Sequence, residues 1–510
     1  LVCGTRGRWF ESTLLYQKMV KEKKLKPELA SGFIDRKGNE LILKDRLIEI
    51  IKRNFQLYGF EPLETPGFEI SENIGKFLPD EDRPMSGVFG FKDDKDWISL
   101  RYDLTAPLAR YVGANFNNLS KPFKRYQVGT VWRNEKPGPG RFREFTQVDA
   151  DIVGTKNILA DAEVSILLAD TLAKCGLNKS DFIIRVNNRK CLTGIFEWLK
   201  ITDEKQIVNT IRAIDKMDRL GNEGVKSLLG KGRKDESGDF TKGVGLNSKQ
   251  IKEIIDYINT DIEFFRPAPD ASYDGISKIY DDGIKELSNF FNNTRVSEFR
   301  NQIVYSSSLV RGIEYYTGTI FEAELLFKVK NKMGLEIEFG SVGGGGRYDN
   351  LVSRFSNNSA PATGISIGLD RLLLAIQQRK NSMQPESTGP VVICVFNRKQ
   401  FLASPGKDYD ITAPYYKILS MLRSAGIKSE IYSGDGSIKA QMKYADKRNS
   451  PAAILYGENE AKLGIVTIKN LKAGKEASSK IKTREDWKKN ENVQETVKLE
   501  ELVDEIKKLL

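Results

Sequence analysis

The spacing of apolar residues changes along this chain, and each spacing predicts a different element. Apolar residues recur every three or four positions at 43–58 and at 158–175, which predicts two amphipathic helices. Two prolines at 61–67 force extended backbone after the first helix. Period-two segments at 97–101, 126–135 and 143–153 predict strands. A mixed, partly helical stretch runs to about 293, strands resume at 309–325 and 336–342, and residues 364–368 lead into a helix at 369–379.

The pattern changes again toward the C-terminus. Residues 377–390 are polar and predict a linker. Fully apolar runs at 391–396 and 452–456, with a helical segment at 415–425, predict a separate small α/β domain with a parallel or mixed sheet. Within the mixed stretch, glycines and charges at 229–238 predict a mobile insertion without a core.

One predicted hairpin carries an unusual set of side chains. Its first strand ends near Glu135, residues 136–140 form the turn, and its second strand begins at Arg143. Period two places Arg133 and Glu135 on one face of the first strand. The matching face of the second strand carries Phe145, Gln147, Asp149 and Asp151. Alternation alone fits a ligand surface and the solvated face of an antiparallel sheet equally well.

Three further segments stand out. Arg311 lies inside a strand-like apolar run, where an arginine faces either an anionic ligand or a buried carboxylate. Four glycines at 343–346 predict a close backbone approach, with a flexible loop as the alternative. Arg371 falls in the first turn of a predicted helix, where the side chain and the helix dipole together would attract phosphate.

Composition narrows the chemistry. The 510 residues suffice for roughly three folding units, and the net charge of +11 favours a polyanionic partner such as a nucleic acid or nucleotide. The chain contains no histidine, which excludes Ser-His-Asp triads and histidine-containing zinc sites. Its four scattered cysteines suggest neither zinc nor disulfides, and a reducing compartment is expected. GxxxxGK[ST] and strand-to-helix GxGxxG motifs are absent, and apolar runs fall short of the ~18 residues of a membrane span.

Together these segments resemble the class II aminoacyl-tRNA synthetases. The region of Pro66 is similar to motif 1, the Arg133 hairpin to motif 2, and residues 364–371 to motif 3. The peptides LVRGIEYY at 309–316 and GGRYD at 345–349 resemble the two that distinguish histidyl-tRNA synthetases from the rest of the class. The resemblance runs from about residue 30 to the C-terminus, where residues 441–448 look like part of that family's anticodon-binding domain.

The resemblance implies an α+β catalytic domain built on an antiparallel sheet. This domain would span 31–380 with a mostly helical insertion at about 190–295, followed by a linker at 381–390 and an α/β anticodon-binding domain at 391–510. Residues 1–30 would be an N-terminal extension, such as a transit remnant. The implied activity is ATP-dependent ligation of L-histidine to tRNA(His) through a histidyl-adenylate. The implied partners are tRNA(His), histidine, ATP with Mg²⁺ and a second copy of the chain, without zinc or a membrane, in the cytoplasm or alternatively an organelle.

The resemblance also implies residue roles. Arg311 and Arg133 would be the catalytic arginines, with Arg133 on the α-phosphate and the histidine carboxylate. Histidine would be bound by Asp103, Thr105, Arg133, Gln147, Asp151, Arg311, Tyr315 and Tyr316. ATP would be bound by Arg133, Glu135, Phe145 and Arg371.

Two departures from the family pattern remove no ligand. Thr146 stands where the family often has histidine, and Glu314 stands where aspartate is common. One competing interpretation is a catalytically inactive, synthetase-like regulatory or RNA-binding paralogue, although such proteins commonly lose arginines that this chain keeps. Another is a class II synthetase for glycine, threonine or proline, against which the paired tyrosines after Arg311 argue.

Overall fold

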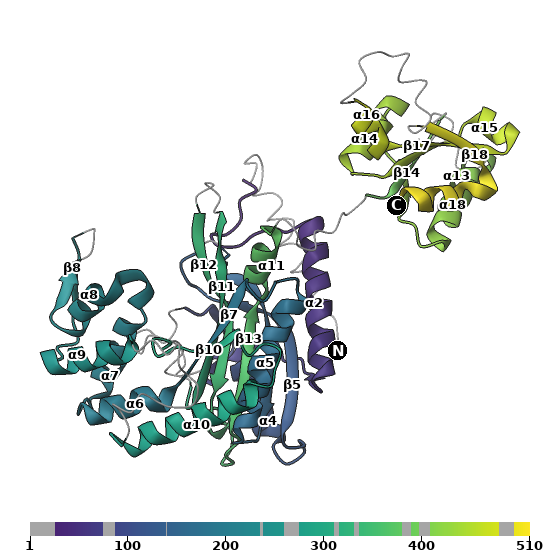
Figure 1. Cartoon of the computed structure of the whole chain (residues 1–510). Coiled ribbons are helices and arrows are strands. Elements are labelled where there is room, and N and C mark those ends of the chain that lie inside the picture. Colours follow the sequence, from purple (N-terminus) through teal and green to yellow (C-terminus); the bar gives the residue numbers. More distant parts are fainter. Residues whose placement is uncertain are drawn as a thin grey trace. The chain divides into compact units, whose positions relative to one another are not determined.

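An eight-stranded sheet forms the centre of the first of two units in the computed structural model (Figure 1). The units are Leu1–Gln384 and Pro385–Leu510, and each is described by itself. The structure describes residues 26–74, 87–138, 140–234, 238–259, 275–310, 316–330, 336–379, 389–396, 409–478 and 494–510. The predicted N-terminal extension and linker therefore lie largely outside the described residues.

The large sheet is mostly antiparallel, as the resemblance implies. Its strands follow the order β1-β5-β6-β13-β12-β11-β7-β10. Only the two edge strands, β1 and β10, pair in parallel with their neighbours. The strands are β1 (Glu61–Pro62), β5 (Phe123–Trp132), β6 (Glu144–Val153), β7 (Phe182–Asn188), β10 (Ile303–Tyr305), β11 (Thr319–Lys330), β12 (Glu336–Arg347) and β13 (Ala362–Gly368).

Helices cover one face of this sheet because its alternate residues are apolar. Val148, Ala150 and Ile152 of β6 belong to the main core, to which α2 (Asn39–Leu57) contributes Leu43 and Phe55 among others. The other helices that pack around this core are α5 (Ile158–Lys174), α10 (Lys278–Thr294) and α11 (Leu369–Gln377). Because successive strand residues face opposite sides, the odd-numbered residues of β6 face away from the helices.

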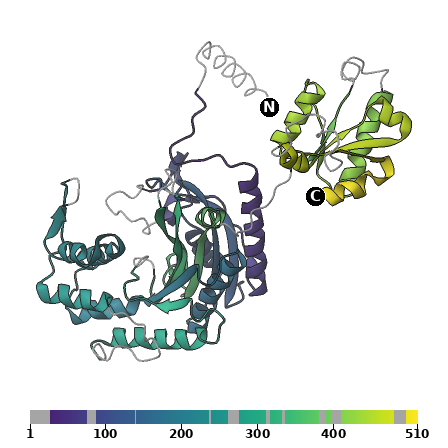
Figure 2. The ribbon, with the colours of Figure 1, turned by 45° about the horizontal axis from the view of Figure 1, so that its top comes forward.

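Smaller elements flank the sheet. α4 (Thr105–Asn115) packs with a 3₁₀ turn, η3 (Val352–Arg354), in a satellite core. A three-stranded sheet of β2 (Phe68–Ile70), β4 (Asp96–Leu100) and β3 (Gly90–Asp93) adjoins α3 (Ser71–Ile74). The chain between β7 and α10 is mostly helical and contains α6 (Arg189–Trp198), α7 (Glu204–Ile214), α8 (Met217–Leu229), β8 (Gly232–Lys234), β9 (Phe240–Lys242) and α9 (Ser248–Ile258). Figure 2 shows these elements beside the sheet in a second view.

The segment at 229–238, predicted to be an insertion without a core, contains a strand, β8, whose residues are exposed or half-buried. β8 and β9 pair as a hairpin, and Leu229 is fully buried. Glycine makes the pairing possible, because a Cβ on Gly232 would lie 2.3 Å from the Thr241 carbonyl oxygen. Residues read as chain breakers therefore permit a close strand approach.

Two strand boundaries also differ from the predictions. The first hairpin strand ends at Trp132, because the Asn134 amide donates to the Gly87 carbonyl and leaves the ladder. The strand predicted from 309 begins at Thr319. Leu309 is buried in a turn instead, where the Asn187 side-chain amide donates to its carbonyl oxygen at 2.9 Å.

The second unit is built on a mixed five-stranded sheet, which confirms the predicted α/β architecture. The order is β15-β14-β16-β17-β18, parallel for the first three strands and antiparallel thereafter. Its strands are β14 (Val391–Cys394), β15 (Ser429–Ile431), β16 (Ala452–Leu455), β17 (Ile465–Asn470) and β18 (Gln494–Lys498). Its helices are α13 (Tyr409–Ser424), α14 (Ile438–Lys447), α15 (Glu458–Leu463), α16 (Leu471–Ser478) and α18 (Leu502–Leu509). In the described parts of both units, no helix is long and apolar enough to cross a membrane.

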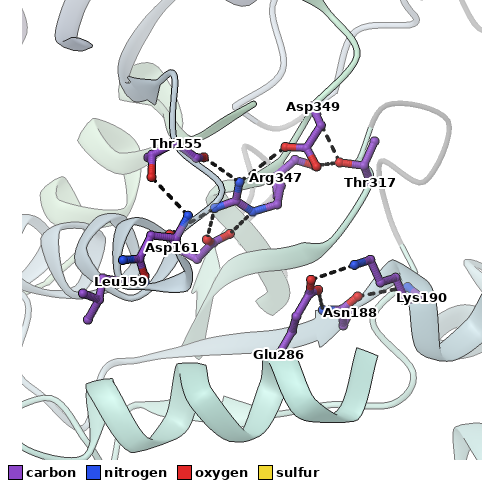
Figure 3. A network of polar contacts seen from close by, with 10 residues as sticks. Thr155, Leu159, Asp161, Asn188, Lys190, Glu286, Thr317, Arg347 and Asp349 are labelled. Carbon is purple, nitrogen blue, oxygen red and sulfur yellow. Dashed lines mark hydrogen bonds and ion pairs between the residues drawn. The ribbon is translucent and has the colours of Figure 1, made fainter. Parts of the chain in front are cut away.

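A buried ion pair joins the end of β12 to α5 (Figure 3). Nε and Nη2 of Arg347 both donate to the Asp161 carboxylate, and Nη1 donates to the Thr155 carbonyl oxygen at 2.9 Å. Asp349 accepts from the same Nη1 at 3.3 Å. The side chains of Arg347 and Asp161 are 4% and 0% exposed. Removing Asp161 takes away the buried counter-charge of Arg347 and leaves it the partly exposed Asp349.

Asp161→Ala is therefore expected to lower the free energy of unfolding of the first unit by about 3–5 kcal/mol. The control is Glu49→Ala, which removes an exposed ion pair to Arg53 on α2 and is expected to change that free energy by less than about 1 kcal/mol. Urea unfolding of the full-length protein followed by circular dichroism measures both. Equal losses in the two variants would contradict the structural role given to Asp161.

Candidate active site

A cavity of about 350 Å³ opens on the sheet face that the helices leave uncovered. Glycines 343 and 344 of β12 and Ser366 of β13 contribute to its floor. Its other residues come from these two strands, the β5–β6 hairpin and the start of α11. Five sequence-predicted residues line it: Arg133, Glu135, Phe145, Gln147 and Arg371.

Aromatic rings hold Arg133 in place. Its guanidinium carbon lies 4.3 Å from the centroid of the Tyr102 ring and 5.2 Å from that of Phe145. Its Nε donates to the Tyr102 carbonyl oxygen at 3.2 Å. The Tyr102 hydroxyl donates to Glu135 Oε1 at 2.8 Å, and burial raises the pKa of this phenol to about 12, which keeps it a donor. A planar cation fixed in this way suits an anionic oxygen.

Arg371 lies in the first turn of α11, as predicted. Its Nη2 donates to the Phe339 carbonyl oxygen, and its guanidinium carbon lies 5.2 Å from the centroid of the Phe339 ring. The adjacent Asp370 is structural, because it accepts from the Thr146 amide at 2.6 Å and pairs with Arg36 at 2.8 Å. Arg371 is thus anchored to β12, and Asp370 ties the start of α11 to β6 and to the N-terminal segment.

Asp103 caps α4. Its Oδ1 accepts from the backbone amides of Thr105 at 3.1 Å and Ala106 at 2.9 Å, the usual contacts of an acidic residue at a helix start. The negative charge of Asp103 contributes to raising the pKa of Asp149 and Asp151. The structure therefore places the Asp103 carboxylate in the electrostatic environment of the β6 carboxylates, together with Thr105 at the start of the same helix.

Asp151 is held by two residues that the sequence interpretation missed. Arg125 of β5 pairs with Asp151 Oδ2 at 2.7 Å, and the Tyr348 hydroxyl donates to Oδ1. Arg125 is fully buried and also donates to the Leu104 carbonyl oxygen at 3.1 Å. The register of the hairpin could have identified Arg125. Trp132 pairs with Glu144, and in the same register Arg125 lies directly opposite Asp151.

Gln147 and Asp149 continue the same face of β6. The Gln147 side-chain amide donates to Ser366 Oγ at 3.0 Å. Burial raises the pKa of Asp149 to about 7, Arg125 opposes this rise, and the neighbouring Asp151 carboxylate adds to it. Burial raises the pKa of Asp151 as well, against the effects of Arg125 and Tyr348.

Tyr316 completes the described part of the site. Its ring packs against Gly346 of β12, where an added Cβ would lie 2.9 Å from the ring. Burial raises the pKa of this phenol, and the charges of Asp149 and Asp151 raise it further, so the hydroxyl stays protonated. Arg311 and Tyr315 lie outside the described residues. Among the residues described, no group of three or more Cys, Asp and Glu side chains could hold a metal ion.

Comparisons with known proteins agree over nearly the whole chain. The family described as "Histidyl-tRNA synthetase" matches residues 32–372, and "Anticodon binding domain" matches 391–509. The "Histidine--tRNA ligase" of Bartonella henselae is 46% identical over 500 residues, covering 96% of this chain and 98% of the relative. That of Brucella suis is 45% identical over 506 residues, covering 96% and 97%. The crystal structure of histidyl-tRNA synthetase from Nostoc sp. PCC 7120 superposes with a TM-score of 0.68 at 27% identity, covering 96% of this chain and 100% of that one.

The raised pKa of Asp149 predicts how stability depends on pH. The carboxyl group keeps its proton in the folded chain up to about pH 7, whereas in the unfolded chain it ionises near its ordinary pKa of 3.8. The folded state therefore binds more protons in this window, and the free energy of unfolding should fall as pH rises from about 4 to about 7. Asp149→Asn should flatten this slope in urea unfolding at a series of pH values. Parallel slopes for the two proteins would contradict the assignment.

Proposed function

The chain belongs to the histidyl-tRNA synthetase family, and we propose that it ligates L-histidine to tRNA(His), consuming ATP and passing through a histidyl-adenylate. The observation that carries this proposal is the agreement between near-full-length similarity to histidine–tRNA ligases and a cavity that gathers Arg133, Phe145, Gln147 and Arg371. The comparisons give no support to a catalytically inactive paralogue, and the family match overturns the alternative of a glycine, threonine or proline enzyme.

Activation requires two anions to meet. The histidine carboxylate attacks the α-phosphorus of ATP in line, and pyrophosphate leaves. The carboxylate is already ionised, so this step needs no protein base. Arg133 offsets the repulsion and the charge that develops in the transition state, because the Tyr102 and Phe145 rings hold its guanidinium at the hairpin end.

The nucleotide occupies the hairpin side of the cavity in this proposal. Phe145 stacks on adenine, and Glu135, fixed by the Tyr102 hydroxyl, contacts the nucleotide. Arg371, at the start of α11, binds the γ-phosphate, where the helix dipole adds a positive partial charge. Mg²⁺ enters with ATP as part of the substrate, because it binds chiefly through phosphate oxygens.

Histidine occupies the deeper side, above β6. Asp103 and Thr105 hold its amino group from the start of α4, and Gln147, Asp151 and Tyr316 surround the ring. The two remaining roles rest on family resemblance alone: Arg311 as the second catalytic arginine and Tyr315 as a further histidine contact. In the second step the terminal tRNA hydroxyl must lose a proton, and in a chain without histidine we assign its acceptance to a phosphate oxygen of the adenylate.

We also propose the domain boundaries given by the sequence: catalytic residues 31–380 with an insertion at about 190–295, a linker at 381–390 and an anticodon-binding domain at 391–510. The mixed sheet of the second unit supports the last of these. Within it, the Gln441 amide is structural, because it bonds both the amide and the carbonyl of Val395. Free, buried Cys175, Cys191 and Cys394 support a reducing location, for which we propose the cytoplasm.

A homodimer is supported by an apolar patch on the three-stranded sheet. The patch consists of Phe68, Ile70 and Phe91, which are 52%, 44% and 49% exposed. The rings of Phe68 and Phe91 lie edge to face with centroids 5.7 Å apart. Exposed apolar side chains that gather on one sheet face favour burial against a partner. The patch follows the motif 1 proline, Pro66, and we propose that a second copy of the chain covers it.

Pyrophosphate exchange tests the function. The full-length protein should exchange pyrophosphate into ATP with histidine and with no other amino acid, and should charge tRNA(His). Arg133→Ala should lower the histidine-dependent exchange rate by on the order of 10²-fold or more, because it removes a transition-state donor. Arg53→Ala, which removes an exposed arginine on α2, should leave the rate unchanged. A folded protein that binds ATP but shows no exchange with any amino acid would refute the proposal.

Sedimentation velocity tests the dimer. Phe91→Asp places a charge in the apolar patch and should shift the protein from dimer toward monomer, because a desolvated, unpaired carboxylate is unfavourable in an interface. Val296→Asp makes the same kind of change at an exposed residue after α10 and should leave the dimer intact. A monomeric wild type, or dimers in both variants, would argue against this interface.

A further inference from the structure

Asp149 lies on β6 between two residues that are proposed to bind histidine, yet family resemblance gives it no role. On β6 it stands between Gln147 and Asp151, two positions from each and on the same face. Across the sheet its direct partner is Ser366 of β13, which lines the cavity together with Gln147. The Ser366 side chain also hydrogen bonds to the Asp149 carboxyl group. The register therefore places Asp149 on the same sheet face as Gln147 and Asp151, beside the cavity-lining Ser366.

One carboxylate oxygen of Asp149 is buried without a hydrogen-bond donor in the described chain. The residue is 1% exposed, and within the described chain no hydrogen-bond partner meets its Oδ1. Gln147 Oε1 is in the same situation, in a residue that is 7% exposed. A buried acceptor without a donor costs free energy, and two of them side by side are most simply explained by a ligand that brings donors.

Asp151 differs from Asp149 in this respect. Its carboxylate is already engaged by the Arg125 guanidinium and the Tyr348 hydroxyl. Both partners come from the protein itself, so Asp151 is fixed whether or not a substrate is bound. Within the described residues, Asp149 receives a hydrogen bond from Ser366 while its Oδ1 has no partner, which leaves it better able to respond to a substrate.

Among the described residues, carboxylates outnumber the cations that pair with them around Asp149. One buried guanidinium, that of Arg125, serves two carboxylates on β6, and Asp103 adds a third negative charge from the start of α4. The Arg101 guanidinium also acts on Asp149, but its hydrogen bonds go to the Thr65 and Thr130 carbonyl oxygens. The other titratable groups that act on this cluster in the described chain are Tyr316 and Tyr348. Buried carboxylates with this set of partners favour a cationic or proton-bearing ligand.

We propose that Asp149 is a specificity-determining residue for the amino acid substrate, whose carboxylate accepts the hydrogen bond of an imidazole N–H and selects a ring basic enough to share its proton. The inference rests on the proposed function and extends it. No covalent step is involved: one proton lies between the Asp149 oxygen and the ring nitrogen, and either group can carry it. Up to about pH 7 the Asp149 carboxyl group of the substrate-free protein carries this proton. Binding of a neutral ring then exchanges no proton with solvent.

The consequence is a pH dependence confined to the amino acid. Above about pH 7 Asp149 loses its proton and the free ring is already neutral, so binding must take one proton up from solvent. The kcat/KM for histidine should therefore fall as pH rises from about 7 to about 8.5, whereas KM for ATP should not follow it. A site that recognises only ring shape would show no such fall.

Steady-state pyrophosphate exchange by the full-length protein tests this. Asp149→Asn keeps the size of the side chain and removes its charge. It should raise KM for histidine by about 10- to 100-fold, the range of a hydrogen bond to a charged group, and leave KM for ATP unchanged. The wild type should also prefer histidine to 2-fluorohistidine, whose ring has nearly the same size but is far less basic, and the variant should lose that preference.

Asp181→Asn is the matched control. It removes a buried carboxylate that pairs with Arg379 in the same unit but belongs to no part of the proposed site. Both KM values should stay at the wild-type level. If Asp149→Asn leaves KM for histidine unchanged, or raises KM for histidine and ATP together, the inference is overturned.

If Asp149→Asn fails to fold, the comparison of histidine with 2-fluorohistidine in the wild-type protein still tests the inference. Equal use of histidine and 2-fluorohistidine at every pH would overturn the role of Asp149 while leaving the proposed function standing. No histidine-dependent exchange in the wild type would overturn the proposed function itself, and the inference with it.

Discussion

The site depends on one buried arginine. Arg125 is fully enclosed in the sheet, where an unpaired guanidinium would be strongly unfavourable. Its ion pair with Asp151 and its hydrogen bond to the Leu104 carbonyl join β5, β6 and the residue before α4. The Tyr348 hydroxyl adds the chain just after β12 to the same carboxylate. Four segments are thus held around one charge, and the proposed histidine pocket lies where they meet.

Glycine supplies the room that this arrangement requires. A Cβ on Gly364 of β13 would lie 2.0 Å from Asp151 Oδ1, so any side chain there would displace the carboxylate. On the adjacent strand, a Cβ on Gly346 would meet the Thr319 carbonyl oxygen at 2.5 Å as well as the Tyr316 ring. The glycines of the GGRYD peptide and of motif 3 therefore act through the space they leave for side chains above the sheet.

The sequence alone predicted those features of the fold and the site that depend on residues close together in the chain. Period two correctly placed Gln147, Asp149 and Asp151 on one face of β6, and Arg371 was correctly placed in the first turn of α11. Tyr348 was missed because its contact with Asp151 spans 197 residues and depends on the strand order, which no local pattern encodes. Arg347 of the same peptide proved structural for a similar reason, since its partner Asp161 lies on a helix 186 residues earlier. The strand end at Trp132 depends on a bond to Gly87, another distant residue.

Because the chain contains no histidine, the carboxylate cluster is relevant to how the protein responds to pH. Most proteins sense pH near neutrality through imidazole, and this chain has none. Burial and the neighbouring carboxylates of Asp151 and Asp103 bring the pKa of Asp149 into that range instead. In the proposed reaction the imidazole arrives with the substrate, so the protein and its ligand each supply one group that titrates near pH 7. A pocket of this kind recognises its substrate by proton affinity as well as by shape, and an apolar or weakly basic ring of the same size would leave its buried acceptors unpaired.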